Sequence, residues 1–370
     1  MPKVDNREVW SNIKKEVNHD KLIYLFIATT SALFYLASFL VNAEQQIEYS
    51  FFLYLKVLAE TCYFTFIIWC TYYYFYLLFH RASHPTRKFI AKIKSFFNPP
   101  YQLIGFVLLL LALNLTFSCY TYLKSIIPSI HYFSWDLAFY QLDKALHFGI
   151  SPWEITHAIF SSPWSSFVIN FFYHLWFFFM WATVLFFIVN KSNAQLRTQF
   201  LLSFLACWLL IGGVAAVLLS SAGPCYLHLL NPEFNFYQPL LERLTQQSNE
   251  LVSHGWFPLW ILDVQDMLWQ SYVDSKGGAG AGISAMPSMH VSIAVLMALS
   301  LSKVNRILGN AMWLFALVIQ IGSVHLAWHY AVDGYMSFIL TTSIWFLCGK
   351  VVRWNNPTPA VPKAVEKDSL

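Results

Sequence analysis

Long apolar segments are the feature that most limits what this chain can fold into. A helix that crosses the ~30 Å hydrocarbon core of a bilayer needs about 20 mostly apolar residues. Six runs meet this requirement, and two shorter runs with polar residues at one end complete a set of eight predicted spanning helices. In chain order these are Leu22–Val41, Cys62–Phe79, Leu103–Leu123, Phe167–Val189, Phe200–Ser220, Met286–Ser302, Ile307–Trp328 and Gly334–Val352. The sequence therefore predicts an all-α, polytopic membrane helical bundle.

The composition of the chain agrees with this class. Hydrophobic residues make up 57% of the 370 residues and charged residues only 11%, whereas a soluble domain carries roughly 25% charged residues. The polar surface is too small to cover a water-soluble fold, so one membrane domain accounts for nearly the whole length. The six cysteines show no C-x-x-C spacing and lie mostly in apolar runs. We interpret them as small apolar residues rather than as a disulfide frame or a metal site.

The distribution of Lys and Arg tests the helix count and predicts an orientation. If the N-terminus lies in the cytoplasm and the chain crosses eight times, most of the 23 Lys and Arg residues fall on the cytoplasmic side. The exceptions are Lys56, Lys124, Lys144, Arg243 and Lys276. Because cytoplasmic segments are enriched in these residues, the sequence predicts that both termini are cytoplasmic, in a cell or inner membrane. The basic loop Arg81–Lys94 is interpreted as a contact for anionic lipids rather than nucleic acid.

The predicted helices divide the chain into four parts. Residues 1–21 form a cytoplasmic N-terminal segment, and residues 22–99 form two additional transmembrane helices with the basic loop. Residues 100–352 form a six-helix core with extracytoplasmic loops, and residues 353–370 a disordered cytoplasmic tail. In the first large loop of the core, Trp135–Phe148 carries apolar residues at helical spacing beside charged ones. This pattern predicts an interfacial helix that lies along the membrane surface.

The first of two polar clusters begins the sixth predicted helix. Ionisable residues at membrane depth are costly and usually serve a function. In the segment Ser284–His290, which follows the Gly-rich run Gly277–Gly282, His290 falls in the first turn of the helix beside the hydroxyl of Ser288. The unpaired N–H groups and the dipole of a helix start both favour a negative charge. The cluster is therefore a candidate phosphate site, although Ser288 is also a normal N-terminal capping residue.

The second polar cluster lies where the seventh predicted helix ends and the eighth begins. His325, His329 and Asp333 follow each other at intervals of four residues, which places them on one face wherever the chain is helical. A carboxylate one turn from an imidazole can accept its ring N–H and fix the tautomer. The other ring nitrogen is then free to act as a nucleophile or base. The predicted topology brings both clusters to the same membrane face.

These two clusters carry a family resemblance. The pair P-S-M-H and H-Y-A-V-D resembles the second and third signature motifs of the type-2 phosphatidic acid phosphatase superfamily of lipid phosphatases and phosphotransferases. More narrowly, G-I-S-A-M-P-S-M-H followed by H-Y-x-x-D is similar to the branch that includes the fungal inositol phosphorylceramide synthases. The resemblance covers the last six predicted helices, roughly residues 100–350, and leaves the first two as an addition.

The resemblance implies a role for each matching residue. His329 would be the nucleophile that forms a phosphohistidine, and Asp333 would orient it. His290 would be the general acid that protonates the leaving oxygen, and Ser288 would bind a phosphate oxygen. The residues alone already suggested this division between a nucleophile and an anion site, whereas the reaction class comes from the resemblance.

The sequence also departs from the superfamily pattern. The first motif, K-x-x-x-x-x-x-R-P, has no match before the second, and the Arg usually six residues before the nucleophile is here Ser323. The inositol phosphorylceramide branch also lacks the first motif. A transferred phosphoryl group needs positive charge around its oxygens. By location, His325, Lys276 and Arg243 are the candidates to bind the substrate phosphate.

These features predict a membrane lipid phosphatase or phosphotransferase. It would cleave a lipid phosphoester through a phosphohistidine at the extracytoplasmic face and pass the group to an acceptor alcohol or to water. The predicted partners are the bilayer, a lipid phosphate or phospholipid and an acceptor alcohol, with no metal, organic cofactor or nucleic acid; the oligomeric state is left open. Two alternatives remain: a lipid transporter with a similar polar-lined bundle, and a catalytically inactive scaffold, which the missing cations would explain.

Overall fold

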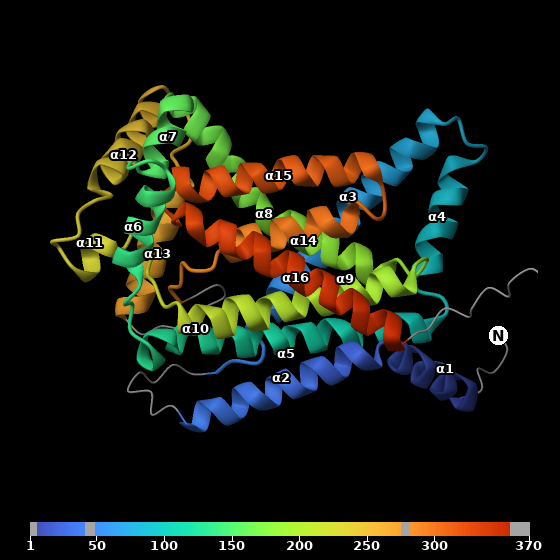
Figure 1. Cartoon of the computed structure of the whole chain (residues 1–370). Coiled ribbons are helices and arrows are strands. Elements are labelled where there is room, and N and C mark those ends of the chain that lie inside the picture. The colour runs from blue at the N-terminus through green and yellow to red at the C-terminus, as the bar shows by residue number, and fades with distance from the viewer. Residues whose placement is uncertain (1–5, 41–48, 275–281, 356–370) are drawn as a thin grey trace, which may run out of the picture.

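The fold is a bundle of long helices with shorter helices gathered at one end (Figure 1). The computed structural model describes residues 6–40, 49–274 and 282–355. Helices dominate this part of the chain and it contains no strand, so the predicted all-α class is confirmed. The Gly-rich run before the first polar cluster and the predicted disordered tail lie almost wholly outside the described residues.

Six helices in the described ranges are long and apolar enough to cross a membrane. They are α3 (Leu55–Phe79), α5 (Pro100–Ile130), α8 (Pro163–Val189), the run Ala194–Leu218 formed by α9 (Ala194–Leu209), η1 (Leu210–Ala215) and α10 (Ala216–Leu218), α15 (Arg306–His325) and α16 (Ala331–Asn355). Two shorter apolar helices accompany them, namely α14 (Met289–Leu301) and the Lys21–Leu36 part of α2 (Lys21–Leu40). Each predicted apolar segment falls on one of these helices. The chain is an integral membrane protein, while the count of eight crossings stays a prediction.

α14 lies in the interior of the bundle. It contacts α8, α9, α15 and α16, and its side chains from Val291 to Ala298 are all buried. A helix that is apolar on every side must be enclosed, and here the neighbouring helices enclose it. The first turn of α14 faces the end of the bundle where the shorter helices gather (Figure 1).

A buried ion pair fixes the N-terminal helices to the rest of the bundle. α1 (Asn6–His19) and α2 pack against α5, and Asp20 lies between them in the chain. Arg197 on α9 donates from Nη1 to Oδ1 of Asp20 and from Nη2 to Oδ2 at 3.0 Å. It also donates from Nε to the carbonyl of Ile188 at 3.3 Å. Because a buried guanidinium is tolerated only when its donors are paired, the N-terminal helices are an integral part of this fold.

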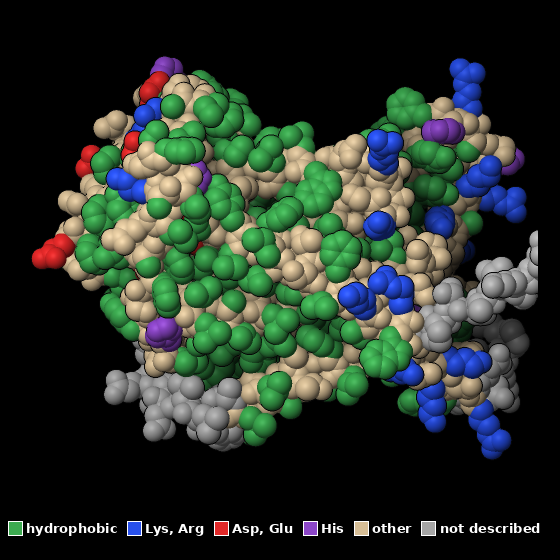
Figure 2. Space-filling model, viewed as in Figure 1, with side chains coloured by type: hydrophobic (Ala, Val, Ile, Leu, Met, Phe, Trp, Pro, Cys, Tyr) green, Lys and Arg blue, Asp and Glu red, His purple; other side chains and the backbone are tan. Residues whose placement is uncertain are grey.

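The two ends of the bundle differ in charge. Most of the Lys and Arg side chains visible in Figure 2 gather at the end formed by α1 and α4 (Pro85–Phe96), where the predicted basic loop is largely helical. The opposite end carries a cap, which we define as α6 (Asp136–Leu146), α7 (Pro152–Ile159), α11 (Leu227–Leu230), α12 (Gln238–Ser253) and α13 (Trp260–Val273). The helix predicted at Trp135–Phe148 exists as α6. Its two aspartates point into the protein rather than toward water, with Asp136 only 4% and Asp143 only 1% exposed.

Candidate active site

His329 and Asp333 lie at the junction of α15 and α16, at the capped end of the bundle. Nδ1 of His329 lies 3.1 Å from Oδ2 of Asp333, which also accepts the backbone N–H of Tyr330 at 3.1 Å. This contact favours the tautomer with its proton on Nδ1, which leaves the Nε2 lone pair available. Burial lowers the pKa of His329 from 6.5 to about 3. The ring is therefore neutral at pH 7, as a nucleophile must be.

His290 faces His329 from the first turn of α14. The centroids of the two imidazole rings are 6.0 Å apart. Two aromatic residues of α8 pack against His290: its ring centroid lies 4.6 Å from that of Tyr173 and 4.4 Å from that of Trp176. Trp176 also donates from Nε1 to the backbone carbonyl of His290 at 2.9 Å. These contacts hold the imidazole in place opposite His329.

The loop before α14 joins the two clusters directly. The backbone N–H of Ser288 donates to the carbonyl of Asp333 at 3.3 Å. The hydroxyl of Ser288 accepts the N–H of Val291 at 3.4 Å, so this residue is the N-cap of α14. The structure thus brings together four of the predicted site residues, namely Ser288, His290, His329 and Asp333.

Gly223 allows a third loop to pack against both clusters. Its φ is +96°, and a Cβ at this position would lie 2.8 Å from the carbonyl oxygen of Trp328 and 2.9 Å from Cβ of Ala285. Nearby, the N–H of Cys225 donates to the carbonyl of Ala327 at 3.0 Å. Only glycine combines this backbone conformation with so close an approach. The loop therefore supports the segment that carries His329 from one side.

Asp136 holds this loop and the His329 segment together. Its carboxylate accepts the N–H groups of Ala222 at 2.9 Å and Gly223 at 2.8 Å. It also accepts the hydroxyl of Tyr330 at 2.9 Å, and Tyr330 is the residue that follows His329. Burial raises the pKa of Asp136 above 3.8, against the opposing effect of these hydrogen bonds.

Asp143 lies seven residues, or two helical turns, after Asp136 on the same face of α6. It accepts the N–H of Ala331 at 2.7 Å and that of Val332 at 2.9 Å. These are the first two residues of α16, whose N–H groups have no partner within the helix. Asp143 therefore caps α16 from another helix. Burial raises the pKa of this carboxyl from 3.8 to about 6.

His325 belongs to a neighbouring cluster centred on His157 of α7. The two rings stack with their centroids 3.7 Å apart and their planes 7° from parallel. Nε2 of His325 lies 2.8 Å from the hydroxyl of Ser166, and Nδ1 lies 3.3 Å from the hydroxyl of Thr156. Both ring nitrogens of His325 therefore have protein partners. The predicted phosphate contact of His325 stays a prediction.

Two other residues were predicted to bind phosphate, namely Arg243 and Lys276. Arg243 on α12 donates from Nη2 to the carbonyls of His157 at 3.4 Å and Ser161 at 3.3 Å. It lines a shallow polar pocket of the cap together with Glu242. Lys276 lies outside the described residues. A different cation lies against the loop that leads to His290.

That cation is Lys124, near the end of α5. The loop before α14 packs against it: a Cβ on Gly282 would lie 2.9 Å from the carbonyl oxygen of Lys124 and 3.0 Å from its Cγ. In the sequence this residue stands out only as an exception to the cytoplasmic bias of Lys and Arg. No motif marks it, because its proximity to the histidines depends on how α5 packs against the loop before α14.

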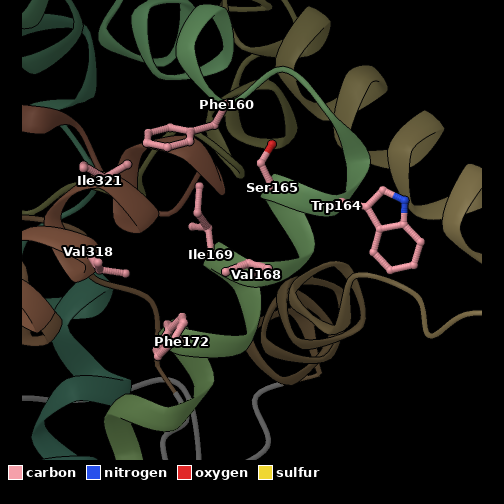
Figure 3. A pocket seen from close by; sticks show the side chains of 8 residues that line it. All are labelled: Phe160, Trp164, Ser165, Val168, Ile169, Phe172, Val318 and Ile321. Atoms are coloured by element: carbon pink, nitrogen blue, oxygen red, sulfur yellow. The ribbon is translucent and has the colours of Figure 1, made fainter.

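An apolar groove runs beside the site between α8 and α15 (Figure 3). It has a volume of about 430 Å³. Its lining residues are Phe160, Trp164, Ser165, Val168, Ile169, Phe172, Val318 and Ile321. Ile169 lies one helical turn before Tyr173, and both approach Gly322 of α15, where an added Cβ would lie 3.2 Å and 3.0 Å from their side chains. Since Tyr173 also stacks on His290, the groove and the site share a wall.

The fold and the site together define a membrane protein built around an internal histidine pair. The family model for the PAP2 superfamily (type-2 phosphatidic acid phosphatases) matches residues 137–347, more than half of the chain. The chain belongs to this superfamily, whose members are generally phosphatases and phosphotransferases. No curated protein and no solved structure matches it. The matched region includes both histidine clusters and begins after α5, so Lys124 lies outside it; the inositol phosphorylceramide branch stays a prediction.

Proposed function

We propose that this protein cleaves a lipid phosphoester through a phosphohistidine on His329. The observation that carries the proposal is the buried His329–Asp333 pair, with His290 facing it at a ring-centroid distance of 6.0 Å. In a near-attack arrangement the nucleophile lies ~3–3.5 Å from the reacting atom. The two facing rings offer a nucleophile and a proton donor to one phosphoryl group. Membership of the superfamily supports the same reaction class.

In the first half-reaction, Nε2 of His329 attacks phosphorus. The N–P bond forms while the bond from phosphorus to the leaving alcohol oxygen breaks. His290, in its protonated form, donates a proton to that oxygen, and the bound phosphate supplies the negative charge that favours this form. Asp333 keeps its contact with the Nδ1–H of His329 and stabilises the positive charge that develops on the ring.

In the second half-reaction, the acceptor transfers a proton to the neutral His290 and its oxygen attacks phosphorus. The N–P bond breaks and His329 returns to its neutral form. If the acceptor is water, the protein is a phosphatase, and if it is an alcohol, the protein is a phosphotransferase. The resemblance of the P-S-M-H segment to the inositol phosphorylceramide branch favours transfer to an alcohol.

We infer that the groove between α8 and α15 holds a hydrocarbon chain of the substrate. Its lining is almost wholly apolar, and it lies between two helices that are long and apolar enough to cross a membrane. Its wall at Ile169 and Tyr173 leads to His290. A lipid could therefore keep its chain in the groove and present its phosphate to His329.

The proposed reaction takes place at the extracytoplasmic face. The histidine pair lies at the capped end of the bundle, opposite the end where Lys and Arg gather (Figure 2). Because basic segments remain in the cytoplasm, this charge distribution supports cytoplasmic termini and an extracytoplasmic site.

The direct test is turnover of a panel of lipid phosphates by detergent-purified protein, with and without acceptor alcohols. The variants are His329→Ala and, as a matched control, His254→Ala, which removes an exposed histidine of the cap. Phosphate release without an acceptor, lost only in His329→Ala, identifies a phosphatase. Transfer that requires an alcohol identifies a transferase. The absence of turnover in the wild type across the panel would refute the proposal and favour the inactive scaffold or the transporter.

A further inference from the structure

The phosphate site described so far lacks an assigned cation. A phosphoryl group carries its charge on oxygens that need positive or hydrogen-bonding partners in a water-poor site. Asp333 adds negative charge, and His329 must be neutral to attack. The Lys and Arg that the superfamily usually supplies are absent from the corresponding positions of this sequence.

Lys124 has the properties of the missing cation. It is partly buried near the end of a membrane-spanning helix. It lies one helical turn after Tyr120, whose ring packs together with the sulfur of Met289 against Gly212, so this end of α5 adjoins the first turn of α14, which carries His290. Within the described ranges, no ion pair or side-chain hydrogen bond joins Lys124 to another residue. A partly buried ammonium group without a counter-charge is costly. Its partner is therefore expected to be a ligand.

Close packing fixes the position of Lys124. A Cβ on Gly282 would lie 2.9 Å from the carbonyl oxygen of Lys124 and 3.0 Å from its Cγ. Gly282 has a φ of +90° and directly precedes the loop that leads to His290. Glycine at this position thus lets the loop before α14 lie against both the backbone and the side-chain stem of Lys124.

Tyr173 provides a second group without a partner. Its hydroxyl is buried and makes no hydrogen bond within the described residues, although its ring stacks on His290. A buried donor without an acceptor costs about 1–3 kcal/mol, so a ligand oxygen that accepts from it would remove this cost.

We propose that Lys124 and the hydroxyl of Tyr173 complete an oxyanion-binding site for the substrate phosphate between His290 and His329. The two residues replace the cations of the superfamily's missing motif positions, and α5, which contributes Lys124, lies outside the matched region. The inference rests on the proposed function and names the groups that bind the phosphate oxygens. Lys124 supplies charge, and Tyr173 donates a hydrogen bond.

The first test measures binding of orthovanadate, a soluble phosphate analogue, by calorimetry on the full-length protein in detergent. Lys124→Gln is expected to weaken binding by at least about 10-fold and Tyr173→Phe by roughly 3- to 10-fold, as expected for losing a charge-assisted and a neutral contact. Lys124→Arg keeps the charge and is expected to bind more tightly than Lys124→Gln. Lys144→Gln is the matched control, because Lys144 lies over the ring of Tyr140 in the cap.

The second test measures the thermal unfolding midpoint of Lys124→Met without ligand and with orthovanadate. Removal of a partly buried cation without a counter-charge is expected to raise the midpoint of the free protein, while the shift caused by orthovanadate shrinks. A lower midpoint with an unchanged orthovanadate shift would assign Lys124 a structural role and overturn the inference.

The outcomes separate this inference from the proposed function. If His329→Ala abolishes turnover while Lys124→Gln and Tyr173→Phe bind orthovanadate as the wild type does, the phosphohistidine chemistry stands and the assignment of Lys124 and Tyr173 falls. If the wild type neither turns over any lipid phosphate nor binds orthovanadate, both proposals fall together.

Discussion

Substitution of Asp143 by Asn tests whether α6 positions the nucleophile without touching the substrate. The carboxylate accepts two backbone N–H groups at the start of α16, at 2.7 and 2.9 Å, one on each oxygen. The amide of Asn offers one oxygen, so one of these hydrogen bonds is lost. A hydrogen bond to a charged group is worth about 1.5–3 kcal/mol. If about 2 kcal/mol of this is lost in the positioning of His329, kcat falls by roughly 30-fold.

The same substitution is expected to leave the stability of the fold unchanged or slightly higher, although it lowers kcat. Burial raises the pKa of Asp143 from 3.8 to about 6, and this rise corresponds to about 3 kcal/mol against the ionised form at neutral pH. A carboxyl of this kind stabilises the fold below pH 3.8, and its contribution is lost as the pH rises through about 6. At pH 7.5, Asp143→Asn removes this penalty along with one hydrogen bond. The unfolding midpoint is therefore expected to stay level or to rise slightly.

The assay measures kcat and the unfolding midpoint of wild type, Asp143→Asn and the control Gln141→Ala, which alters an exposed residue of α6. Wild-type kcat should fall as the pH decreases through about 6, because a protonated Asp143 no longer accepts both N–H groups. The kcat of Asp143→Asn should be low at every pH and should not decrease further as the pH falls through about 6. Full activity in Asp143→Asn, or a loss of activity matched by a loss of stability, would refute the positioning role.

The remaining predictions concern the acid, the groove and the supporting loop. His290→Gln should lower turnover of alkyl phosphate esters by about 10²–10⁴-fold but spare aryl esters, whose leaving groups need no proton; equal losses for both would exclude a general-acid role. Val168→Trp, which fills the groove, should raise KM for long-chain but not short-chain substrates, and an equal effect on both would argue against a chain site there. Gly223→Ala should lower the unfolding midpoint by several degrees, because its Cβ would meet the carbonyl of Trp328; an unchanged midpoint would show that the loop can shift.

Hydrophobic runs predicted the helices well because a bilayer-sized apolar segment has few other ways to satisfy its backbone. The helical stretch of α1 was not predicted, since Asn6–His19 is polar and short. Its place depends on long-range contacts, namely packing on α5 and the pairing of the adjacent Asp20 with Arg197. Local sequence patterns carry no information about such pairs.

The proximity of the proposed reactive residues was predictable for a similar reason, because His290 and the His329–Asp333 pair stand in short segments whose internal spacing already limits their geometry. Their supports were not predictable in this way. Asp143 and Asp136 were interpreted as the polar side of a surface helix, whereas the structure buries both against backbone N–H groups. Amphipathic spacing identifies two faces of a helix. It does not tell whether the polar face meets water or the N–H groups of a neighbouring segment.

The pairing of the carboxylates around the site bears on the proposal that Lys124 binds the substrate phosphate. Asp136 and Asp143 each accept two backbone N–H groups, and Asp333 pairs with His329 while also accepting the N–H of Tyr330. The protein therefore already stabilises the carboxylates of Asp136 and Asp143 by contacts that do not involve Lys124, whereas Oδ1 of Asp333 has no hydrogen-bond partner among the described residues. An ammonium that is not paired with a carboxylate remains available to an incoming anion. The α6 aspartates and Lys124 therefore have separate, complementary roles. The aspartates hold the segment that carries His329 through backbone groups, and Lys124 remains available for the proposed substrate phosphate.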